Sequence, residues 1–189
     1  MIVGVASADK HDTKFKAVPD SQLQIRAVEY DGTVNGTLKV QVKNTGKAVE
    51  KFSATGLYFV PEGDPDSAPQ RLGAVGPMVL DGKKEMQSVD VAAGATVDLA
   101  LDVFCIDSQR PAPTTKNVFD VGTKRLPKEM SKQIEYDADE AVAESKKSGE
   151  AQPRKAAKGA IQGKVWKSRD DKWIDLDGEG KQEIGKKKR

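Results

Sequence analysis

Hydrophobic and polar residues alternate along the first half of the chain, and this pattern predicts β-strands. From Leu23 onward, apolar residues occupy every second position, and the alternation returns at Leu38 after turn signals at Asp31-Gly32 and Asn35-Gly36. Two half-buried runs around a turn are typical of an antiparallel hairpin. The longest alternation covers 97–105, where every second residue is apolar or cysteine. This segment predicts a strand that buries one face.

Several further apolar runs lie between turns rich in glycine and proline, and together they indicate about six or seven short strands. Many short strands with frequent turns favour two packed antiparallel sheets. We therefore expect an immunoglobulin-like antiparallel β-sandwich over 22–107. The expectation concerns the architecture alone, because the Cys…Trp…Cys signature of antibody domains is absent.

The second half of the chain has a different pattern. Residues 108–126 are rich in proline and polar residues and are predicted to form a linker. Beyond it, apolar residues recur every three to four positions, which predicts amphipathic helices over about 127–147 and 153–168. Each begins at a proline, which a helix tolerates in its first turn. We expect this helical segment, 127–177, to pack on the sandwich. The predicted apolar stripes consist of Met130, Ile134, Ala138 and Ala141, then Ala157, Ile161 and Val165.

The two ends of the chain lack sustained patterns. Residues 1–21 form a predicted leader, in which Ala6-Ser7-Ala8 fits the small-x-small rule of a signal-peptidase site. We interpret this stretch as the end of a signal peptide that starts upstream of Met1, and an irregular cytosolic terminus is the alternative. The first interpretation predicts a protein that is secreted, periplasmic or on the bacterial cell surface. Residues 178–189 are predicted to be a basic, flexible tail.

Charge and aromatic content make a specific nucleic-acid partner unexpected. The 189 residues include 31 Lys and Arg against 29 Asp and Glu, a net charge of +2, and aromatic residues are 5% of the chain. Single-strand binding needs aromatic faces within a basic groove, and the aromatic residues here are not interleaved with basic ones. The basic end, 186–189, is interpreted as a solvated tail. We expect a protein or surface partner, and the sequence does not indicate an oligomeric state.

The inventory of reactive residues excludes several kinds of site. His11 and Cys105 are the only histidine and the only cysteine, so a single chain can form neither a disulfide nor a His/Cys zinc site. Neither a Walker A loop nor a dinucleotide-binding glycine motif is present. No run approaches the roughly 18 apolar residues of a membrane helix. We therefore expect a non-enzymatic protein without metal, cofactor or membrane span.

One constellation carries a family resemblance. Phe104-Cys105-Ile106-Asp107 closes the last strand, and Ile161-Gln162-Gly163-Lys164-Val165-Trp166 follows in the second helix. Over about residues 100–170, the chain resembles the thioester domains of bacterial surface adhesins. The resemblance implies an internal thioester between Cys105 and Gln162, with Trp166 and Phe104 shielding it. The family usually has threonine before the glutamine and alanine two residues after it, where this chain has Ile161 and Lys164.

Three interpretations of the function remain open. The first is a non-enzymatic interaction or adhesion module that is secreted or attached to the cell surface. The second is a covalent binder that uses a thioester between Cys105 and Gln162 to acylate an amine of its partner. The third is a structural protein of a spore or envelope layer. As an alternative to the thioester, Cys105 is simply the buried end of its strand and Gln162 an exposed helix residue.

Overall fold

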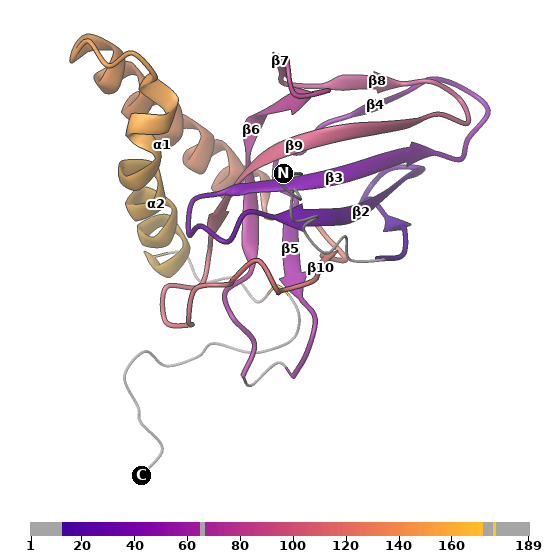
Figure 1. Ribbon diagram of the computed structural model, residues 1–189, viewed down its shortest axis with the longest axis horizontal. Helices are drawn as coiled ribbons and strands as arrows, with labels where there is room; N and C mark the ends of the chain where they lie inside the picture. Colours follow the sequence, from indigo (N-terminus) through magenta and orange to yellow (C-terminus); the bar gives the residue numbers. More distant parts are fainter. Residues whose placement is uncertain (1–12, 65–66, 172–175, 177–189) are drawn as a thin grey trace, which may run out of the picture.

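The computed structural model describes residues 13–64, 67–171 and 176, which form a mainly antiparallel β structure followed by two helices (Figure 1). The strands in this part of the chain are β1 (Lys16–Ala17), β2 (Leu23–Tyr30), β3 (Thr37–Asn44), β4 (Glu50–Phe52), β5 (Tyr58–Pro61), β6 (Leu72–Leu80), β7 (Lys84–Met86), β8 (Val89–Val91), β9 (Thr96–Cys105) and β10 (Phe119–Val121). The helices are α1 (Lys128–Lys147) and α2 (Pro153–Asp171). The predicted mainly β fold with appended C-terminal helices is thereby confirmed.

Most of the strands form one curved sheet that nearly closes on itself. Its order is β1-β2-β3-β9-β6-β5-β10, and β7 pairs with the second half of β6. The two ends of the sheet approach each other where the rings of Tyr30 on β2 and Phe119 on β10 meet edge to face, with centroids 5.4 Å apart. Lys16 on β1 and Asp120 on β10 form an ion pair of 3.7 Å across the same seam. The sheet is therefore barrel-like.

The predicted immunoglobulin-like sandwich is not confirmed. A sandwich needs two facing sheets of several strands, whereas the second sheet in the described part of the chain pairs only β4 with β8. The pairing of β6 with β9 shifts register between Ala74 and Met78. An irregularity of this kind bends a strand and increases its twist. The sheet can therefore curve around one core. The core is enclosed by this curvature and not by a second facing sheet.

The alternation predicted along β9 is confirmed over most of the strand. Its inward-facing side chains, which are all buried, are Leu99, Leu101, Val103 and Cys105. Val97, near the start, is only half-buried, and Asp98 is exposed as predicted. Asp102 departs from the expected exposed position and is half-buried, because two basic side chains of α2 cover its carboxylate.

Both predicted helices are present, and all the residues of their predicted apolar stripes are buried. The two helices pack side by side on the outer face of the sheet, α1 near β6 and α2 near β9 (Figure 1). There they cover Phe104 and Ile106, whose side chains alternate with that of Cys105. A second hydrophobic cluster thus joins the helices to the sheet.

The predicted leader and linker each contribute a strand that the hydrophobic pattern did not indicate. Strand β1 comes from the leader and β10 from the linker, and each lies at one end of the curved sheet. Two predictions fall outside the described residues. They are the signal-like stretch at Ala6-Ser7-Ala8 and the basic tail over 178–189.

Candidate functional site

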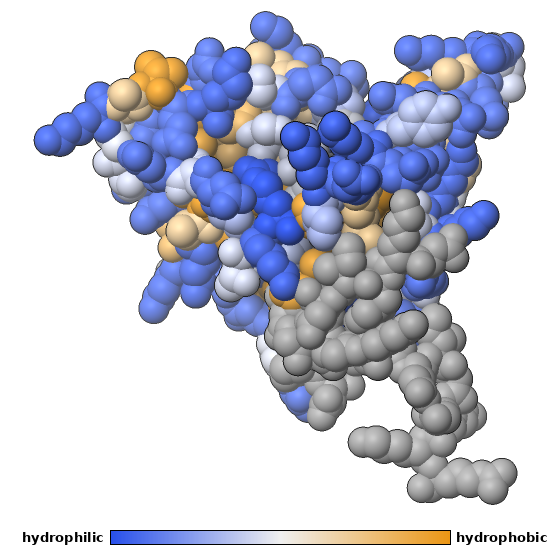
Figure 2. All heavy atoms as spheres, turned by 180° about the vertical axis from the view of Figure 1, so that it is seen from behind, coloured by the Kyte–Doolittle hydropathy of each residue, from blue (hydrophilic) through white to orange (hydrophobic). Residues whose placement is uncertain are grey.

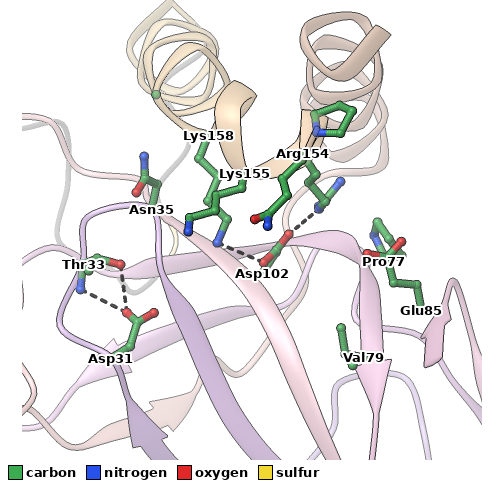
Figure 3. Close-up of a pocket in the computed structure, with 13 residues that line it drawn as sticks. Asp31, Thr33, Asn35, Pro77, Val79, Glu85, Asp102, Arg154, Lys155 and Lys158 are labelled. Carbon is green, nitrogen blue, oxygen red and sulfur yellow. Dashed lines mark hydrogen bonds and ion pairs between the residues drawn. The ribbon is translucent and has the colours of Figure 1, made fainter. Parts of the chain in front are cut away.

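A groove of about 770 Å³ lies where the start of α2 faces the outer surface of the sheet (Figure 3). Its walls come from segments that are far apart in sequence: the β2–β3 turn, β6 with β7, the end of β9, and the first turns of α2. The residues that line it are Asp31, Thr33, Asn35, Pro77, Val79, Glu85, Asp102, Gln152, Pro153, Arg154, Lys155, Lys158 and Gly159. A volume of this size is in the usual range of small-molecule sites.

Asp102 is the centre of a charge network on the floor of the groove. The Arg154 Nε donates a hydrogen bond to Asp102 Oδ2, and the Lys158 Nζ lies 3.2 Å from Asp102 Oδ1. The Arg154 Nη2 also donates to the carbonyl oxygens of Val75 and Gly76, at 3.1 and 2.7 Å. Arg154 therefore fixes the first turn of α2 to both β9 and β6.

The opposite wall of the groove is held by a carboxylate that is engaged within its own turn. Asp31 accepts hydrogen bonds from the N–H and hydroxyl of Thr33, at 3.0 and 2.9 Å, and from the N–H of Thr37, at 2.8 Å. Aspartate commonly closes turns in this way. The side chains of Asn35 and Lys155, by contrast, have no hydrogen-bond or ion-pair partner among the described residues. They are available to a ligand.

A second polar cluster lies at the end of β9, where the structure brings Cys105 and Gln162 together. The Cys105 N–H is shared between the Gln162 Oε1, at 3.0 Å, and the Val34 carbonyl oxygen, at 3.1 Å. The Gln162 Nε2 donates back to the Cys105 carbonyl oxygen at 2.7 Å. The glutamine amide therefore pairs with the main chain of β9 much as a neighbouring strand would.

The Cys105 thiol belongs to the core inside the curved sheet. The side chain is fully buried. Burial raises the pKa of the Cys105 thiol to about 12, and the negative charge of Asp107 adds to the rise. Burial likewise raises the pKa of the neighbouring Tyr30 hydroxyl. The thiol is therefore protonated at neutral pH, and a protonated thiol is a poor nucleophile.

Two residues beyond the cysteine, a buried carboxylate connects three elements. Asp107 accepts hydrogen bonds from the Arg71 guanidinium, at 2.9 Å from Nε and 2.7 Å from Nη2, and from the Arg71 main-chain N–H at 3.1 Å. The Arg169 Nη2, on α2, lies 3.8 Å from Asp107 Oδ1. All three side chains are almost completely buried. One carboxylate thus joins the end of β9, the start of β6 and the last turn of α2.

The remaining predicted site residues occupy different positions. Trp166 is half-buried, packs against the main core and donates from Nε1 to the Gln70 Oε1 at 3.0 Å. Phe104 is buried under the helices, in the second hydrophobic cluster, whereas Cys105 belongs to the main core. Gln162 is 4% exposed, so it is not the exposed helix residue of the alternative interpretation.

Sequence reasoning missed the groove and the Asp107 cluster. Arg154 and Lys158 lie four residues apart, so they share one side of α2, but nothing in the sequence indicates which strand they face. Asp107 did carry a signal, since it directly follows the apolar run 103–106. A carboxylate at the end of a core strand is expected to be buried only with a partner.

Among the described residues, histidine, cysteine, aspartate and glutamate form no cluster suited to a metal ion. Neither α1 nor α2, within that same part of the chain, has the length and apolarity needed to cross a membrane.

No protein-family model matches the chain, and neither the comparison with curated proteins nor that with solved structures found a match.

Proposed function

We propose that the protein is a non-enzymatic binding module that holds its ligand in the groove between α2 and the sheet. The observation that carries this proposal is the groove itself, which is about 770 Å³ in volume and lined from four separate segments. Ligand sites are typically concave, with a few placed polar groups beside apolar surface. The groove combines both, because its lining includes the polar side chains of Lys155 and Asn35 and the apolar side chains of Pro77 and Val79.

The state of the other ionisable groups supports binding over catalysis. The Cys105 thiol has a raised pKa, and Asp107 is paired with a buried guanidinium. Both are engaged in packing and hydrogen bonds that connect structural elements. The face of the molecule seen from behind is mainly hydrophilic, with hydrophobic atoms in small separate groups (Figure 2). The described residues on this face therefore form no broad apolar docking patch.

Secretion and adhesion belong to the same proposal and stay predictions from the sequence. Fractionation of cells that express the tagged protein from its own gene, with the upstream coding sequence kept, would test them. A layer protein should co-sediment with the envelope, whereas a free extracellular module should be recovered from the medium. Recovery from the cytoplasm would contradict both locations.

The groove can be filled by a single substitution in α2. Gly159 lines the groove, and a Cβ placed there meets nothing within 4 Å. Gly159→Trp should therefore fold normally while its indole fills part of the groove. We expect it to abolish binding of compounds found by ligand-observed NMR in a fragment library that contains acids, bases and neutral molecules.

Gly163 provides the matched control. It lies one turn further along α2, it also has open space around its Cβ position, and it does not line the groove. Gly163→Trp should keep the hits that the unmodified protein binds. If Gly159→Trp binds the same compounds as Gly163→Trp and the unmodified protein, the groove is not the binding site. The same conclusion follows if the unmodified protein binds no compound of the library.

The contact between Cys105 and Gln162 favours a second candidate, the covalent binder that the adhesin resemblance implies. The thiol sulfur would bond to the side-chain amide carbon of Gln162, and the carbon–nitrogen bond would break with release of ammonia. A lysine amine of the partner would then attack that carbon, form an amide and release the Cys105 thiol. The observation in support is that the Gln162 side-chain amide lies within hydrogen-bond distance of the Cys105 main chain in a buried environment.

The mass of the intact purified protein separates the two candidates. Because the thiol pKa is raised and the amide is hydrogen-bonded to the main chain, we expect the full sequence mass and a thiol that reacts only after unfolding. A mass lower by one ammonia, restored to the sequence value in Cys105→Ala and Gln162→Ala once each substitution is allowed for, would instead establish the thioester.

A further inference from the structure

We infer that the groove selects small organic anions, with a carboxylate or phosphate group at the α2 end and an apolar body lying toward β6. This inference rests on the proposed function and adds the chemical class of the ligand. Figure 3 shows Arg154, Lys155 and Lys158 reaching from α2 toward Asp102, with Pro77, Val79 and Glu85 on one side and Asn35 on the other.

The charge at the α2 end is positive once the internal pairs are counted. Asp102 is a single carboxylate that contacts two cations, Arg154 and Lys158. Lys155 has no ion-pair partner among the described residues, so it adds a further positive charge. The positive end of the α2 dipole points the same way. Asp31, on the opposite wall, keeps its negative charge although its oxygens accept hydrogen bonds from its own turn. The surplus of positive charge is therefore confined to the α2 end.

The free hydrogen-bonding groups at this end are mainly donors. The Lys155 ammonium has donors and no acceptor, and the amides of Asn35 and Gln152 each carry two N–H donors and one carbonyl acceptor. Arg154 is already used by Asp102 and by two carbonyl oxygens. An anionic ligand group would therefore be bound first by Lys155, with Asn35 across the groove. Lys158 already contacts Asp102 and would add its remaining N–H donors.

The other end of the groove has a different character. Pro77 and Val79 are half-buried on β6 and present apolar surface, and Glu85 is exposed on β7 beside them. A second anionic group would be repelled by Glu85 here, whereas an apolar group would cover the proline and valine. The groove therefore suits a molecule with a single anionic head and an apolar body.

The test is a titration of the isotope-labelled full-length chain, followed by the amide NMR signals of 154–159 and 77–79. The probes are phenylacetate, phenyl phosphate, phenethylamine and inorganic phosphate. We expect both organic anions to shift these signals saturably, with dissociation constants at least roughly tenfold lower than that of phenethylamine. Inorganic phosphate should bind more weakly than phenyl phosphate, because it lacks the apolar body. The better of the two organic anions identifies the preferred head group.

Lys155→Ala should raise the dissociation constant of the organic anions roughly tenfold, as expected for the loss of one hydrogen bond to a charged group. It should leave the dissociation constant of phenethylamine unchanged or lower it, because one repelling positive charge is removed. Lys167→Ala is the matched control, since Lys167 is exposed on the same helix outside the groove. An unchanged NMR spectrum of each variant without ligand checks the fold.

Several results would overturn the inference. They are tighter or equal binding of phenethylamine, equal binding of the two phosphates, equal effects of the two lysine variants, or no saturable shift at the groove. The fragment library used with Gly159→Trp has no charge bias, so it keeps the two proposals distinct. If the hits that depend on the groove are cationic, the proposed binding function is supported, but the inference that the ligand is an anion is contradicted.

Discussion

Asp107→Ala is expected to lower the free energy of unfolding by about 3–5 kcal/mol, the usual range when one partner of a buried ion pair is removed. The carboxylate is fully buried and accepts three hydrogen bonds from Arg71, with the Arg169 guanidinium close by. Without it, two buried cations lose the carboxylate that they share. Urea denaturation followed by tryptophan fluorescence would measure the change.

Asp98→Ala is the matched control on the same strand. Asp98 is exposed, and its carboxylate accepts one hydrogen bond, from the Gln41 Nε2 at 2.9 Å. Its removal should change the free energy of unfolding by no more than about 0.5 kcal/mol. Similar losses in the two variants would show that the buried Asp107 cluster stabilises the fold no more than an exposed carboxylate does.

Leu101→Ala is expected to lower the free energy of unfolding by about 2–5 kcal/mol. Leu101 is 1% exposed at the centre of the curved sheet, where it is paired with Leu38 on one neighbouring strand and Met78 on the other. Truncation would leave a cavity between these two neighbours. Denaturation curves at constant pH would measure the loss.

Val97→Ala tests whether burial causes that effect. Val97 lies on the same strand and the same side of the sheet but is only half-buried near the strand's start. We expect its truncation to cost less than about 1.5 kcal/mol, because little surface is withdrawn from water there. A loss at Val97 equal to that at Leu101 would contradict the burial gradient along β9.

The helices were predictable because their signals are local. The apolar spacing from Met130 to Ala141 indicates that this segment is a helix, and these residues are buried in α1. The proline at position 153 indicates where the second helix begins, and α2 starts there. The strands of the main hairpin were predictable for the same reason. In each case the pattern repeats over several turns or residues within one segment.

The closure of the sheet was not predictable in this way. It depends on β1 and β10, which have two and three residues, too few to show an alternation. It also depends on contacts such as that between Tyr30 and Phe119, which are far apart in sequence. Alternation tells which side of a strand is buried, and a sandwich and a nearly closed sheet produce the same alternation.

The two candidate sites also differ in whether a local sequence signal indicates them. A motif resemblance placed Cys105 and Gln162 together, and they are neighbours in the structure. The groove around Asp102 depends on how α2 docks on the sheet, and no motif encodes that arrangement. Its basic residues are indistinguishable in sequence from other solvated lysines and arginines.

The docking of α2 on β9 has a consequence for how the chain reaches a single structure. A slip of β9 by one residue against β3 would still offer main-chain groups to the Gln162 amide, but it would turn every side chain of β9 to the opposite face of the sheet. Phe104 would then point into the main core and Cys105 would face the helices, so the helices would lose the large apolar side chain that they now cover. Docking of α2 therefore discriminates between correctly and incorrectly aligned sheets, in which strands some 60 residues apart must find their register.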